Sequence, residues 1–115
     1  MKCFLHYNKL MKNFTHPRAE DFSLPAVLAA LGDPHRLALV KQLASCPKGT
    51  PMNCAKAAET LANIPLSTRH HHLRILRESG VILSQRKGVE VLNSLRKVEL
   101  EQRFPGLLKN ILKQG

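Results

Sequence analysis

The stretch from residue 65 to residue 86, PLSTRHHHLRILRESGVILSQR, decides the fold. In its first half, Leu73 and Leu76 lie one helical turn apart and can anchor a helix to a core. Gly80 is the residue type that most often follows the end of a helix. From Ile82 onward the helical period gives way to a period of two, which is typical of strands. The stretch therefore predicts a helix over about 65–79 that leads directly into a strand.

The elements on either side of this stretch complete a known arrangement. Residues 82–86 and 89–94 predict two short strands, and Lys87-Gly88 between them predicts a tight hairpin turn. On the other side, residues 63–65 predict a turn after a short, Ala-rich helix that runs from Asn53 to about residue 62. Two short helices joined by a three-residue turn form a helix-turn-helix, and a hairpin directly after it makes it winged.

Further helices are predicted near both ends of the chain. Residues 24–31 carry an apolar stripe at helical spacing, with Ser23 as N-cap. Asp33 and Pro34 are the cap and first residue of the next helix. Residues 98–103 and the segment from Pro105 predict two terminal helices. The expected fold class is mainly α with a small β-hairpin: a winged helix-turn-helix with terminal helices that form a dimer interface.

The length of 115 residues predicts one domain. We place it at residues 21–115 and expect residues 1–20 to be a flexible basic arm, with four Lys and Arg against Glu20. Either Met1 or Met11 can be the natural start.

The charge of the chain favours a polyanionic partner. Lys and Arg number 18 against 8 Asp and Glu, which gives a net charge of +10. Nucleic acid is the first candidate, an anionic membrane the second, and a solubilising surface the remaining alternative. The sequence has no apolar run long enough to span a bilayer and too short an apolar start for a signal peptide. Three Cys are too few for a disulfide scaffold, so the cytoplasm is the expected compartment.

Two segments resemble the ArsR/SmtB family of bacterial repressors: residues 28–37, LAALGDPHRL, and residues 67–82, STRHHHLRILRESGVI. The likeness extends over roughly residues 24 to 100. It implies a homodimeric repressor on a pseudo-palindromic operator, with a recognition helix in the major groove of double-stranded DNA and a wing near the minor groove. Terminal helices form the dimer contact in this family, which here assigns it to Leu24, Val27, Leu28, Leu31, Leu107, Leu108, Ile111 and Leu112.

The candidate DNA-binding residues lie on the helix 65–79 and at the tip of the hairpin. Hydroxyl, imidazole and guanidinium groups can reach base edges or phosphates, although a polar helix surface and a charged hairpin edge would look the same. Arg69 departs from the family, which has an apolar residue there. Either its stem lies along the core and its head reaches out, or the helix start is turned. The candidates are Ser67, Thr68, Arg69, His70, His71, Arg74, Arg86 and Lys87.

No metal and no other cofactor is expected. Three consecutive His point about 100° apart on a helix and cannot all bind one ion. Both metal patterns of the family are broken, because Cys54 has no paired Cys beside it and no His follows His72. Cys46 and Cys54 flank one loop and could form a thiol switch, or be two small apolar residues. The inducing signal, a small molecule or a redox change, stays open.

One alternative to a DNA-binding regulator stays open as well. A winged-helix module can bind RNA or another protein without any operator. An enzyme is not expected, because the sequence has no nucleophile placed with a base, no Gly-rich phosphate loop and no open metal site.

Overall fold

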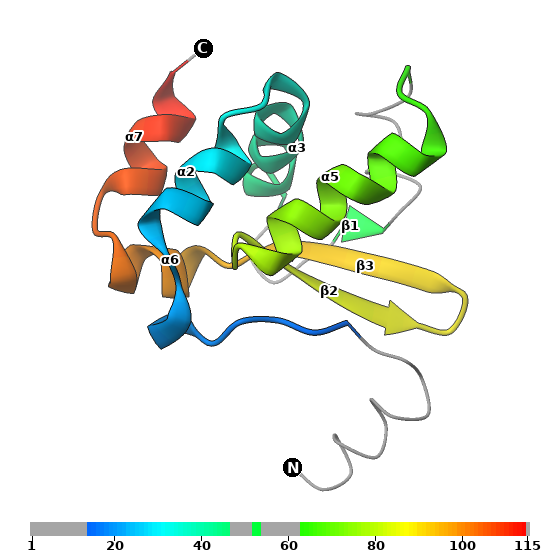
Figure 1. The fold of residues 1–115 in the computed structure, drawn as a ribbon, viewed down its shortest axis with the longest axis horizontal. Helices are drawn as coiled ribbons and strands as arrows, with labels where there is room; N and C mark the ends of the chain where they lie inside the picture. The colour runs from blue at the N-terminus through cyan, green and yellow to red at the C-terminus, as the bar shows by residue number, and fades with distance from the viewer. Residues whose placement is uncertain (1–13, 47–51, 54–62, 115) are drawn as a thin grey trace, which may run out of the picture.

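The computed structural model describes residues 14–46, 52–53 and 63–114 (Figure 1). No helix in these segments is long and apolar enough to cross a membrane. The predicted helix over 54–62 lies outside the described residues. In chain order the elements are η1 (Ala19–Asp21), α2 (Leu24–Leu31), α3 (Pro34–Ala44), β1 (Met52–Asn53), α5 (Leu66–Glu78), β2 (Ile82–Lys87), β3 (Glu90–Leu95), α6 (Lys97–Arg103) and α7 (Leu107–Lys113).

Both predicted helix starts are confirmed by their caps. The Ser23 hydroxyl accepts a hydrogen bond from the backbone N–H of Ala26 at 3.4 Å. The Asp33 carboxylate accepts from the backbone N–H groups of His35 and Arg36 at 2.9 and 3.0 Å. Each cap satisfies donors that have no partner inside the helix. The chain therefore turns sharply between α2 and α3, and this places both helices against α5.

The hairpin is present, with a third strand that the sequence did not predict. Strand β3 lies in the middle of an antiparallel sheet, with β2 on one side and the two residues of β1 on the other. Lys87 pairs with Glu90, so the turn is made by Gly88 and Val89 and not by Lys87 and Gly88. Gly88 takes the positive φ of 63° that a two-residue hairpin turn requires. Asn53, expected to cap a helix, lies in β1 instead.

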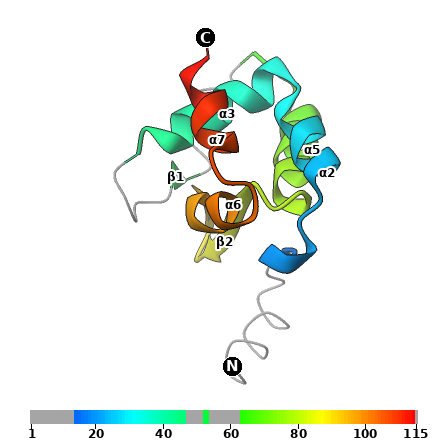
Figure 2. The same ribbon diagram turned by 90° about the vertical axis from the view of Figure 1, so that its left-hand side faces the viewer.

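The core lies where α3, α5 and the base of the hairpin meet. Leu39, Leu76 and Ile82 come from these three elements and are completely buried. Full burial of one such side chain stabilises the fold by about 1.5–3 kcal/mol. Figure 1 shows the far end of the hairpin projecting away from α6 and α7, and Figure 2 shows α5 beside α2. The core therefore fixes one end of the wing and leaves its tip exposed.

The described part of the predicted flexible arm, residues 14–20, is packed against the domain. Its backbone runs beside β2, the edge strand (Figure 1). The His16 Nε2 accepts a hydrogen bond from the backbone N–H of Ser84 at 2.9 Å. Arg96 and Arg103 donate to the backbone carbonyls of Pro17 and Ala19 at 2.8 and 2.9 Å. The His16 bond gives the edge strand β2 a hydrogen-bond partner. The two arginine bonds hold residues 17 and 19 against the rest of the domain.

The apolar stripe expected to form the dimer interface divides into two sets. Val27, Leu31 and Leu108 are 1%, 6% and 7% exposed and belong to the core of a single chain. Leu107, Ile111 and Leu112 are partly buried against the same core. Leu24 and Leu28, on the other side of α2, are 41% and 46% exposed. Of the eight residues, these two offer the most surface to a second chain.

Candidate nucleic-acid interface

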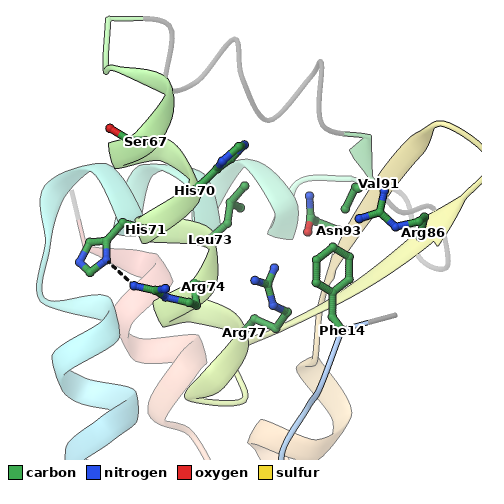
Figure 3. Close-up of a pocket in the computed structure, with 10 residues that line it drawn as sticks. All are labelled: Phe14, Ser67, His70, His71, Leu73, Arg74, Arg77, Arg86, Val91 and Asn93. Carbon is green, nitrogen blue, oxygen red and sulfur yellow. Dashed lines mark hydrogen bonds between the residues drawn. The ribbon is translucent and has the colours of Figure 1, made fainter. Parts of the chain in front are cut away.

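A cleft of about 380 Å³ lies between α5 and the hairpin (Figure 3). Five of the residues predicted to contact DNA line it: Ser67, His70, His71, Arg74 and Arg86. They come together because α5 packs against β2 of the hairpin. The sequence did not single out the other described lining residues, which are Phe14, Leu73, Arg77, Val91 and Asn93.

The exposed face of α5 is polar and cationic. Ser67, His70, His71 and Arg74 are exposed, and their spacing brings them to the same side of the helix. The Arg74 guanidinium lies 3.4 Å from Nδ1 of His71, as Figure 3 shows. The acidic residue of α5 is Glu78, at its last position. Most of the length of this face therefore offers donors to a polyanion without a competing carboxylate.

The other three predicted contact residues are not in the cleft. Lys87 is exposed at the end of β2, beside the hairpin turn. Thr68 is half-buried. Arg69 is also half-buried, and its Nε is enclosed with no hydrogen-bond partner among the described residues. Of the two sequence interpretations of Arg69, the one in which its stem lies along the protein agrees with this burial.

An aromatic ring from the N-terminal segment joins the wing to α5. The guanidinium carbon of Arg77 lies 4.2 Å from the centroid of the Phe14 ring, and that of Arg86 lies 5.5 Å from it. Cations at these distances are attracted to the ring face. Arg77 could have been suspected, because it is three residues after Arg74 and seven after His70. Nothing in the sequence placed Phe14 here.

A chain of hydrogen bonds crosses from α5 to the buried side of the hairpin. Arg77 donates to the Ser84 hydroxyl at 3.3 Å, and Ser84 donates to Oδ1 of Asn93 at 2.7 Å. A guanidinium can only donate, so the Ser84 hydroxyl accepts from Arg77 and uses its own proton to donate to Asn93. The Asn93 amide must therefore turn its oxygen toward Ser84. Its Nδ2 is buried and has no hydrogen-bond partner among the described residues. A buried donor without a partner costs about 1–3 kcal/mol.

A buried histidine ties α5 to the two helices before it. Arg36 donates to the carbonyls of Ala30 and Ala29 at the end of α2, and its third nitrogen lies 3.0 Å from Nδ1 of His72. Because Arg36 is a donor, Nδ1 accepts and the neutral His72 ring carries its proton on Nε2. Burial lowers the pKa of His72, against the attraction of Asp33. His72 therefore positions the exposed face of α5 and does not belong to it.

Known proteins share this arrangement. Residues 31–85 match the helix-turn-helix domain family. The chain is 27% identical over 97 residues to the uncharacterized HTH-type transcriptional regulator YceK of Bacillus subtilis (strain 168), a match that covers 84% of this chain and 94% of YceK. The crystal structure of the ArsR family transcriptional regulator RHA00566 superposes with a TM-score of 0.61 at 19% identity, over 80% of this chain and 98% of that one.

The chain therefore contains a helix-turn-helix domain and has the winged helix-turn-helix fold of an ArsR family regulator. The transcriptional repressor BigR from Xylella fastidiosa shares this fold, with a TM-score of 0.54 at 23% identity over 70% of this chain and 85% of that one. Each of these relatives is named as a transcriptional regulator or repressor, and the expectation that the chain is not an enzyme agrees with these names.

The described residues of the chain include one of the two cysteines proposed as a thiol switch. Cys46 follows α3, is partly buried, and its Sγ donates to the Gln42 carbonyl at 3.6 Å. Cys54 lies outside the described residues, so the thiol switch remains a prediction. Within the described segments, no three His, Cys, Asp or Glu side chains are grouped so that they could hold a metal ion.

The contact between His16 and β2 should make the stability of the fold depend on pH. Burial, with the charges of Arg96 and Arg77, lowers the pKa of His16 to about 4. Between about pH 6.5 and pH 4 the unfolded chain binds a proton that the folded chain does not. We therefore expect the free energy of unfolding to fall as pH falls through this window. For a half-exposed ring screened by solvent, the loss is on the order of 1–2 kcal/mol.

His16→Gln should flatten this dependence, because Gln can accept the Ser84 bond and does not titrate. Urea unfolding at pH 7 and pH 4.5 measures the effect. Burial lowers the pKa of His72 as well, so only part of the slope should disappear. Exposed His35 gives the control, His35→Gln. Equal slopes in wild type and His16→Gln would contradict the assignment.

Proposed function

We propose that this chain is a transcriptional regulator of the ArsR type, a repressor that binds a pseudo-palindromic DNA operator as a homodimer. The observation that supports this most is the cationic, exposed face of α5 beside the wing, in a chain with a net charge of +10. In winged helix-turn-helix proteins such a helix enters the major groove. Two copies related by a two-fold axis would read two half-sites with centres about 10 bp apart.

The two parts of the interface have different tasks in this proposal. Ser67, His70 and Arg74 are exposed on α5 and can contact base edges. In this proposal they specify the DNA sequence. Arg86 and Lys87 on the wing meet phosphates, which hold the protein without reading sequence. Thr68 and Arg69 are half-buried and make smaller contributions.

Lys87→Ala tests the task of the wing. We expect it to weaken binding to operator and to scrambled duplex by the same factor, because a phosphate contact carries no sequence information. The slope of the logarithm of affinity against the logarithm of salt concentration should fall by about 1 for each phosphate that the variant no longer neutralises. Titrations at several salt concentrations measure both quantities. Lys109→Ala, an exposed charge on α7, is the matched control. A change confined to specificity would refute a phosphate role for Lys87.

Leu28→Glu tests the dimer. Leu28 is 46% exposed, so the substitution can place a charge in a contact between two chains while sparing the core of each. We expect wild type to be a dimer at micromolar concentration by light scattering, and Leu28→Glu to shift toward monomer. Leu108→Glu is a poorer probe, since Leu108 is buried within one chain. A monomeric wild type would contradict the proposed assembly.

A further inference from the structure

We propose that the cleft between α5 and the wing binds a small organic oxyanion, a carboxylate or a phosphate on an apolar body, and that this ligand releases DNA. The release rests on the DNA-binding function proposed above, whereas the binding itself does not.

The charges around the cleft select for an anion. Three guanidinium groups line it, from Arg74, Arg77 and Arg86, and no acidic side chain is among the described lining residues. Guanidinium groups pair with carboxylates and phosphates through two parallel hydrogen bonds. Figure 3 shows Arg77 from α5 and Arg86 from β2 directed toward the space between the two elements, while Arg74 is directed toward His71. An oxyanion here would meet donors from two elements at once.

Asn93 adds an observation independent of the charges. It is completely buried and lines the cleft, and its Nδ2 has no partner among the described residues. The bonds from Arg77 through Ser84 hold Oδ1 on the protein side, and Figure 3 shows the amide nitrogen directed toward the space between Leu73 and Val91. An oxygen of a ligand in the cleft would give this donor the acceptor it lacks.

The remaining lining is apolar. Leu73 and Val91 form walls of the cleft, and the Phe14 ring lies beside Arg77. A volume of about 380 Å³ lies at the lower end of the range for small-molecule sites. The ligand class that fits is therefore a compact apolar group with one anionic end.

Depth distinguishes such a ligand from the phosphate of a DNA duplex. A duplex can reach exposed Arg74, but a backbone held in a double helix is too wide to bring a phosphate to a fully buried amide. A small oxyanion can enter the cleft that this amide lines. Because Arg74 and Arg86 serve both partners, ligand and DNA would compete for them.

Calorimetric titration of the full chain, without DNA, tests the binding. Phenyl phosphate is the probe, and inorganic phosphate is the comparison that lacks the apolar body. We expect one phenyl phosphate per chain and weaker binding of inorganic phosphate. Asn93→Asp keeps the shape and the acceptor for Ser84 but replaces the donor with an anionic oxygen. It should weaken phenyl phosphate binding at least about tenfold, while Lys109→Gln leaves it unchanged.

Phe14→Ala provides a second variant, since Phe14 lies at the edge of the domain and its loss should not unfold the chain. It should weaken phenyl phosphate binding more than inorganic phosphate binding. In a DNA titration, phenyl phosphate should lower the affinity of wild type for DNA. No saturable binding to wild type, or equal binding to wild type and to both variants, overturns the site. Binding that leaves DNA affinity unchanged overturns the competition. A chain that binds phenyl phosphate but no DNA would refute the proposed function and leave the site standing.

Discussion

Gly80→Ala should lower the free energy of unfolding by about 2–5 kcal/mol, more than the same change at the other glycines that the structure describes. Gly80 has a φ of 92°, which is strained for any residue with a side chain. A Cβ built there would lie 2.3 Å from a carbon of the Phe22 ring, which is buried. The strain and the collision add, because moving Phe22 would disturb the core next to α2.

Gly88→Ala separates the two causes. Gly88 also has a positive φ, 63°, but a Cβ there would meet nothing within 4 Å. It should cost only the strain of the backbone, about 1–2 kcal/mol. Urea unfolding of both variants measures the difference. Equal losses would mean that the Phe22 ring moves aside freely, and would refute the close packing of the α5 end against η1 and α2.

Arg74→Ala should have the largest effect on operator binding. A side chain that pairs with a base edge discriminates by about 1–3 kcal/mol, and a homodimer carries two copies. We therefore expect operator affinity to fall about 30-fold or more, with relaxed preference at one position of each half-site. Scrambled duplex should lose much less.

Binding titrations on operator and scrambled duplex, together with a repeat of sequence selection on the variant, measure this. Lys109→Ala again serves as the control for removal of one positive charge. If Arg74→Ala weakens both duplexes by the same factor, with a matching fall in salt dependence, then Arg74 contacts phosphate and does not read a base.

The features that depend on neighbours in the chain were predictable from the sequence. The Ser23 and Asp33 caps act within three residues of themselves, and their helices begin where predicted. The end of α5 at Gly80 and the hairpin that follows are local in the same sense. The turn was one residue off because Gly88 needs the first turn position, while Lys87 can continue the strand and pair with Glu90.

The positions of Phe14 and Asn93 in the lining of the cleft could not be predicted, because contacts between residues far apart in the sequence bring them there. His16 meets Ser84 across 68 positions of sequence, and this contact brings Phe14 to the wing. Asn93 is polar, and a short strand pattern gives no reason to bury it; its position opposite Ser84 in the sheet does. Likewise, the stripe on α2 looks continuous in sequence, but only the packed core shows that Val27 and Leu31 face inward while Leu28 does not.

Selection of bound sequences from a pool of random DNA duplexes by the purified chain tests sequence-specific recognition most directly. We predict enrichment of a pseudo-palindrome with half-site centres about 10 bp apart, and no such enrichment when both Ser67 and Arg74 are replaced by Ala. A pool that stays random after repeated rounds with wild type would contradict sequence-specific recognition, and would favour a winged-helix module that binds RNA or another protein.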